Sequence, residues 1–207
     1  MALNPHKALT IMKHKDKTKR FEFQHDGQSV YWVSANAKDH TLSLHSDKSD
    51  KEPRTGVIID DDRNFQIFAG ALRAGDSVAR SIGEDGRALT RSCTFVVGGR
   101  TLSWRRMEDK EVTLSNGEIT NGLDWKLVTA VDMQGCDALA LYVHSQKKFD
   151  KVRGRIYLLR DLSDQVEVIS LTAIVGILER EALANTLKSE NWLIGLWNGA
   201  GPGLASW

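Results

Sequence analysis

The sequence predicts a mainly β fold, a closed antiparallel barrel around one buried, hydrophobic C-terminal helix. The helix is predicted by residues 166–187, VEVISLTAIVGILEREALANTL, which carry no charge between Val168 and Leu178 and place apolar side chains all around a helical wheel. Such a helix is buried in a core or in a membrane, and this uncharged run is far shorter than the ~20 residues of a bilayer span. The barrel is predicted by many short strand-like runs joined by turn residues.

Composition favours one continuous core in an ordinary globular protein. Of the 207 residues 41% are hydrophobic, and 28 basic side chains stand against 27 acidic ones, which gives a net charge of +1. This balance argues against a nucleic-acid partner. Cys93 and Cys136 have neither the number nor the spacing of a disulfide framework or a metal site, and the N-terminal residues lack the apolar segment of a signal peptide. We therefore expect a cytoplasmic protein with no metal, no cofactor and no transmembrane segment.

The first half of the chain predicts a series of strands joined by tight turns. Asp26-Gly27 is a strong signal for a two-residue hairpin turn. The basic stretch at 13–20 (KHKDKTKR) predicts a solvated loop, with contact to an anionic surface as the alternative. Residues 60–64 (DDDRN) lack the glycine and the glutamate of a calcium loop further on, so they indicate a turn. Strands are expected at residues 8–12, 21–24, 30–33, 41–45, 56–60, 65–68 and 78–82.

The second half contains the clearest hairpin, then three more strands and the helix. CTFVV at 93–97 runs into Gly98-Gly99, which can supply the positive φ angles of a two-residue turn, and RTLSWRR returns. Asp164 predicts a helix cap, and Glu167 completes a capping-box pattern. Residues 188–207, rich in Trp and Gly, predict a tail that packs over a barrel mouth, with an interfacial anchor as the alternative. The remaining strands are expected at 124–128, 138–143 and 155–159, and the helix at 164–187.

The order of these elements resembles a known family. FVVGGRTLSWRR, DWKLV, ALALYV and a strand leading into a hydrophobic helix are similar to the tubby C-terminal-like superfamily, which includes LURP-one-related proteins and phospholipid scramblases. The likeness is greatest to small single-domain members found in fungi, and it covers roughly residues 20–185. It implies a barrel of about twelve strands around a central helix. It also implies binding of phosphoinositide headgroups by surface Lys and Arg, as in tubby proteins.

In these terms the chain divides into three parts. An N-terminal strand and basic loop (1–20) precede a tubby-like β-barrel (20–187) that holds the central helix at 164–187, and a Trp- and Gly-rich tail (188–207) follows.

The candidate ligand site is the second hairpin, where Arg100, Arg105 and Arg106 surround Trp104. Arginine beside an aromatic ring can grip phosphate or stack on a planar ligand. The alternative is a strand whose Trp lies in the core and whose Arg residues are solvated or paired with the acidic residues that follow. Since neighbouring strand residues point to opposite faces, we expect Arg106 at a barrel mouth and Arg105 on the outer surface.

No motif predicts catalytic residues. Cys93 or Cys136 with His144 as base is one combination, but Cys93 lies in an apolar strand and is expected to be a buried, inert thiol. Two hypotheses follow. The first is a non-enzymatic tubby-like module that binds a small molecule, an anionic lipid headgroup or a protein partner. The second is a metal- and cofactor-independent enzyme, of the isomerase or cyclase type, with its site at a barrel mouth.

Overall fold

The computed structural model of the chain describes residues 2–14, 19–36, 41–46, 53–59, 65–69, 77–80, 92–108, 111–129, 137–145 and 151–199. These ranges contain twelve strands and one helix: β1 Lys7–Lys13, β2 Lys19–His25, β3 Gln28–Asn36, β4 Thr41–His45, β5 Thr55–Ile59, β6 Phe65–Ala69, β7 Ser77–Arg80, β8 Ser92–Val97, β9 Arg100–Arg106, β10 Trp125–Thr129, β11 Ala140–His144, β12 Val152–Leu158 and α1 Asp164–Gly199.

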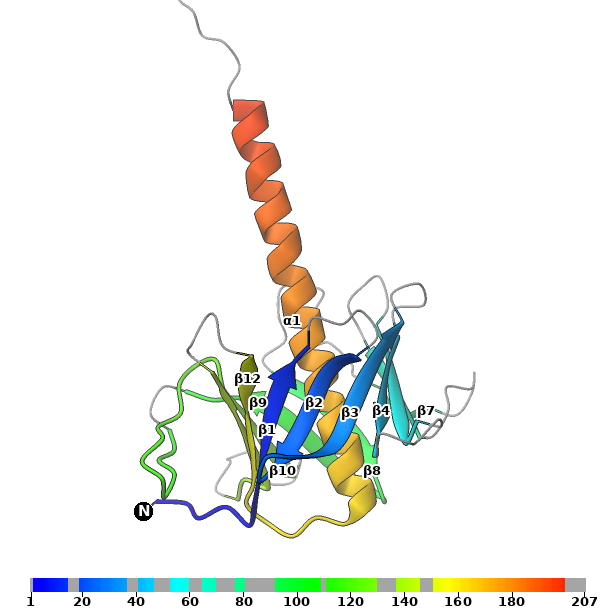
Figure 1. Cartoon of the computed structure of the whole chain (residues 1–207), viewed down its shortest axis with the longest axis vertical. Coiled ribbons are helices and arrows are strands. Elements are labelled where there is room, and N and C mark those ends of the chain that lie inside the picture. The colour runs from blue at the N-terminus through cyan, green and yellow to red at the C-terminus, as the bar shows by residue number, and fades with distance from the viewer. Residues whose placement is uncertain are drawn as a thin grey trace, which may run out of the picture.

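The twelve strands form one antiparallel sheet in the order β7-β6-β5-β4-β3-β2-β1-β12-β11-β10-β9-β8. Neighbours in the sheet are therefore neighbours in sequence, except where β1 pairs with β12 in the middle. Figure 1 shows this sheet curving around α1, with β1–β4 on the near side of the helix and β8–β10 on the far side. The pairing of β1 with β12 is what places strands from both halves of the chain around the same helix.

The two ends of the sheet are β7 and β8, which lie close to each other. Within the described ranges no hydrogen-bonded ladder joins these two strands. The structure thus confirms a mainly β fold in which one C-terminal helix packs on an antiparallel sheet. Closure of that sheet into a barrel, as the sequence predicted, stays a prediction.

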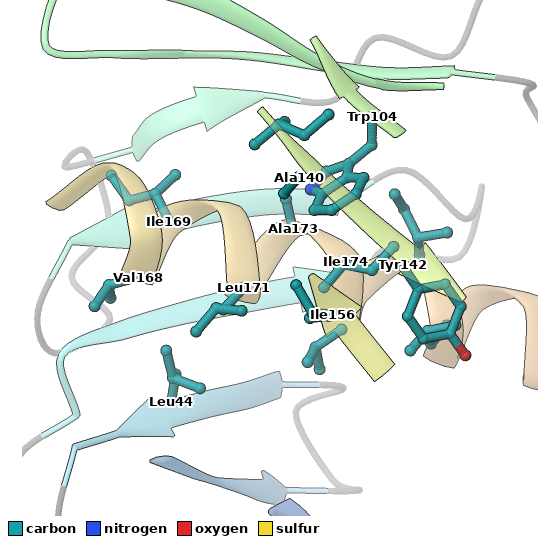
Figure 2. Close-up of a cluster of buried hydrophobic side chains, with 14 of the residues drawn as sticks. Leu44, Trp104, Ala140, Tyr142, Ile156, Val168, Ile169, Leu171, Ala173 and Ile174 are labelled. Atoms are coloured by element: carbon teal, nitrogen blue, oxygen red, sulfur yellow. The ribbon is translucent and has the colours of Figure 1, made fainter. Parts of the chain in front are cut away.

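The apolar first half of α1 forms the centre of the core. Figure 2 shows side chains such as Leu44, Trp104 and Ile156, which come from three different strands, around the helix. Burial of one such apolar side chain contributes about 1.5–3 kcal/mol, so this surface dominates the stability of the fold. The helix residues predicted to be buried are all at most 3% exposed, which confirms the prediction: Val168, Leu171, Ile174, Val175 and Leu178.

The first turn of α1 is tied to the sheet by two carboxylates. Asp164 forms an ion pair with Arg54, and Oε1 of Glu167 accepts hydrogen bonds from Lys7 Nζ at 2.6 Å and the Tyr31 hydroxyl at 3.2 Å. The sequence predicted that these two acids cap the helix locally. Their carboxylates instead make tertiary contacts, because strands β1, β3 and the start of β5 surround this end of the helix. As negative charges at a helix N-terminus they still favour its dipole.

The helix continues past Leu187, where the sequence prediction ended it, and runs to Gly199. Figure 1 shows the second half of α1 extending away from the sheet rather than folding back over it. The expectation that residues 188–207 form a tail packed over a barrel mouth is therefore corrected for residues 188–199. Across the described stretches of the chain, no helix is long and apolar enough to cross a membrane.

A second, smaller apolar cluster lies on the outer face of β11 and β12. The segment that follows β9 crosses this face, and Leu3 of the N-terminal arm packs beside it. The cluster is held by backbone hydrogen bonds from Leu3 N to Thr113 O at 3.0 Å and from Ser115 N to Leu3 O at 2.9 Å. Its buried members are Met107, Leu114, Leu141, Val143 and Tyr157. This outer layer gives the molecule a recessed surface that a bare sheet would lack.

Candidate functional site

Arg106, the last residue of β9, points towards the helix. One Nη atom pairs with Oε1 of Glu181 in α1, and the other donates to the backbone oxygen of Leu123. Its guanidinium carbon lies 4.5 Å from the centroid of the Trp125 ring, a cation–π arrangement. The side chains of the ion pair are only 21% and 14% exposed. Burial raises the pKa of Glu181, although nearby arginines, with Arg106 foremost, oppose this shift.

A polar cluster fills the same end of the sheet. The hydroxyl of Tyr142 lies 3.2 Å from Nδ1 of His144 and donates to the backbone oxygen of Arg153 at 3.2 Å. The carboxylate of Asp124, which is fully buried, accepts the backbone N–H groups of His144 and Asn121, each at 2.7 Å. Burial raises the pKa of Tyr142 and of Asp124 and lowers that of His144. At this end of the sheet, these polar groups are therefore hydrogen-bonded to one another and to the backbone.

The other three residues of the predicted ligand site lie apart from one another. Trp104 has no exposed surface, and its indole Nε1 donates to the backbone oxygen of Ser170 in α1 at 3.0 Å. Arg105 lies on the opposite face of β9, in register with Lys126 of β10. Arg100 is exposed beside the hairpin turn. The four predicted residues therefore do not form one site. Of the three arginines, Arg105 is the one that lies beside Lys126 on the outer face.

A groove lies on the outer face of the sheet close to Lys126, with a volume of about 200 Å³. Five segments form it: the N-terminal arm, the segment after β9, the strand β10, the residues before β11 and the residues after β12. Its lining residues are Leu3, Asn4, Glu111, Val112, Lys126, Asp137, Ala138, Leu159 and Arg160. The groove therefore combines an apolar surface with charges of both signs.

Two ion pairs divide the charges of this groove into an inner and an outer set. The inner pair joins Lys126 Nζ to Glu111 Oε1, with side chains 10% and 27% exposed. The outer pair joins Arg160 Nη2 to Asp137 Oδ1 at 3.1 Å, with side chains 60% and 72% exposed. Burial alone would raise the pKa of Glu111, but the hydrogen bond from Lys126, further hydrogen bonding and the Lys126 and Arg105 charges lower it overall. Glu111 is thus ionised at neutral pH.

Sequence reasoning missed this groove because no local pattern marks it. Its two cations, Lys126 and Arg160, are separated by two strands, and each stands in a segment that predicts ordinary strand or loop structure. The one available signal was Lys126 inside the apolar run DWKLV, since a lysine in a half-buried strand needs a partner.

Other predicted features have simpler outcomes. Cys93 is only 1% exposed, which confirms its expected burial. Cys136, the turn at 60–64 and residues 15–18 of the basic stretch lie outside the described residues. Among the residues that the structure does describe, no group of three or more His, Cys, Asp or Glu side chains could hold a metal ion.

Comparisons with known proteins give the chain no relative from which a function could be transferred. No family model, no curated protein and no solved structure matches it. The evidence on its function is therefore the charge, burial and shape of the groove and of the end of the sheet where α1 leaves it.

Proposed function

We propose that the chain is a non-enzymatic binding module, a tubby-like closed barrel that acts in the cytoplasm and recognises its ligand on the outer face. The observation that carries this proposal is that, among the described residues, the part of α1 inside the sheet is buried. The central helix residues are at most 3% exposed, and the Arg106–Glu181 pair occupies the end where the helix leaves the sheet. This burial favours a ligand site on the outer face, where the groove provides a hollow.

Two further observations support parts of the proposal. The proximity of β7 to β8 supports closure of the sheet into a barrel, since these strands are its two ends. Arg105 supports an outer site, because its charge acts on Glu111 in the groove and its strand neighbour is Lys126. Arginine at such a position can add affinity for an anionic group of the ligand, such as a lipid headgroup or a carboxylate.

The test is chemical-shift mapping on the ¹⁵N-labelled full chain. Two titrants are used separately. One is a preparation of vesicles that contain phosphatidylinositol bisphosphate, and the other is a mixture of small metabolites. We expect shifts at amides around the groove, weakened in Arg105→Gln and retained in Arg106→Gln. Shifts confined to Tyr142 and His144, with none at the groove, would contradict an outer binding site.

An enzyme is the second candidate, favoured by the contact between Tyr142 and His144. The lowered pKa of His144 keeps its imidazole neutral at physiological pH, so it can accept a proton, as isomerase or cyclase chemistry requires. Conversion of a metabolite, detected by mass spectrometry and lost in a folded His144→Gln variant, would establish this function instead.

A further inference from the structure

We infer that the outer groove binds a small zwitterion, of the class of free α-amino acids with a short aliphatic side chain. The inference rests on the proposed binding function and names the ligand of that same site. Three properties of the groove carry it: its charge balance, its apolar lining and its size.

The charges that line the groove are balanced and arranged in pairs. Lys126 and Arg160 supply two positive charges, and Glu111 and Asp137 supply two negative ones. A ligand with only a negative group would place it near two carboxylates, and one with only a positive group would meet two cations. Like charges at close range in a recess are costly. A zwitterion can satisfy both signs at once and leaves the net charge of the groove unchanged.

The two ion pairs also differ in how readily they can accept a ligand. Lys126 is 10% exposed and fixes the inner end, while Arg160 is 60% exposed and can turn towards a ligand at little cost. Its planar guanidinium suits a carboxylate, which it can bind through two parallel hydrogen bonds. A ligand ammonium then has the carboxylates of Glu111 and Asp137 as acceptors.

The remaining lining sets the size and polarity of the ligand side chain. Leu3, Val112, Ala138 and Leu159 give the groove an apolar surface. Its volume of about 200 Å³ is smaller than the roughly 300–1,000 Å³ of pockets for drug-sized ligands. A short aliphatic side chain is matched to both properties, and a phosphorylated inositol ring is matched to neither the charge nor the lining.

The experiment titrates the ¹⁵N-labelled full chain with L-valine at millimolar concentration. Two analogues keep one charge each: N-acetyl-L-valine retains the carboxylate and L-valinamide the ammonium. We expect amide shifts at Leu3, Val112 and Leu159 with valine, and affinities about tenfold lower for either analogue, since each loses one charge-assisted hydrogen bond.

The variant Arg160→Gln should weaken valine binding about tenfold without changing the fold. Arg155→Gln is its matched control: Arg155 pairs with Glu118 at 3.8 Å, is 50% exposed and does not line the groove, so valine binding should stay unchanged.

The outcomes separate this inference from the function on which it rests. If an analogue binds as well as valine, or if Arg160→Gln binds as well as wild type, the zwitterion is the wrong ligand class and the groove remains a binding site. If valine causes no shift while phosphoinositide vesicles do, the inference fails and the binding module stands. If valine, the phosphoinositide vesicles and the metabolite mixture all cause no shift, both the inference and the proposed function are refuted.

Discussion

Among the glycines whose surroundings the structure defines, Gly154 in β12 should tolerate replacement by a larger residue least. A Cβ atom at this position would lie 2.5 Å from the backbone oxygen of Val143 and 2.6 Å from a ring carbon of Tyr142. Carbon–oxygen contacts between neighbouring strands are ordinarily no shorter than about 3.3 Å, so Gly154→Ala would require a displacement of about 0.8 Å. The oxygen belongs to the ladder between β11 and β12 and cannot turn away.

The cost follows from what that displacement disrupts. Overpacking a well-packed site costs about 1–3 kcal/mol. Separation of the strands would also weaken the hydrogen bond from the Tyr142 hydroxyl to the Arg153 oxygen, worth about 0.5–1.5 kcal/mol. We expect Gly154→Ala to lower the free energy of unfolding by about 2–4 kcal/mol, a large part of the ~5–15 kcal/mol typical of a domain.

Urea denaturation followed by tryptophan fluorescence measures this difference. Gly99→Ala is the matched control: Gly99 has φ +72° and a Cβ added there would have nothing within 4 Å, so only backbone strain of about 1–2 kcal/mol is expected. A Gly154→Ala variant within about 0.5 kcal/mol of wild type would show that β11 and β12 do not approach as closely as described.

Three further predictions concern the central helix, the Arg106–Glu181 pair and His144. Leu171→Ala should lower the free energy of unfolding by about 2–5 kcal/mol in the same urea assay, because it leaves a cavity at a site with 1% exposure; an unchanged midpoint would contradict the central helix. Arg106→Gln should lower the thermal midpoint, since it leaves Glu181 without its partner in a largely buried site, while Arg105→Gln should change it little; equal midpoints would contradict the inward placement of Arg106. Burial and two nearby guanidinium charges lower the pKa of the His144 imidazole below 6.5. As the pH falls, this imidazole is therefore protonated in the unfolded chain before it is protonated in the folded one. The stability that His144 contributes should be complete above about pH 6.5 and fall as the pH drops below it. Urea midpoints of wild type and His144→Gln between pH 7.5 and 5 test this, and a pH-dependence that is the same in both would exclude His144 as the cause.

Features set by local chemistry could be predicted from the sequence. Asp26 and Gly27 have φ of 49° and 77°, and Gly98 and Gly99 have 55° and 72°, as a two-residue hairpin turn demands. The buried helix was also predictable, because an uncharged run with apolar residues on all sides has few alternatives in a chain of this length.

Features set by distant segments could not be predicted. The strand β12 begins at Val152, three residues before its expected start, because Gly154 packs under Tyr142 and pairs with His144 of β11. Asp124 was expected to begin a strand, yet its carboxylate binds two backbone amides and β10 begins one residue later. The groove needs five segments at once, so its members could not be grouped from their spacing.

The position of α1 in the sequence constrains how the protein is made. All twelve described strands precede the helix that covers their inner faces. The strand β1 is paired on both sides only after β12 has been synthesised. On the ribosome, the strands therefore emerge before the element that fills their interior. A nascent chain without residues 164–178 exposes strand surfaces that are buried in the finished protein. Completion of the core thus requires the long-range pairing of β1 with β12, and such pairings are slow to form.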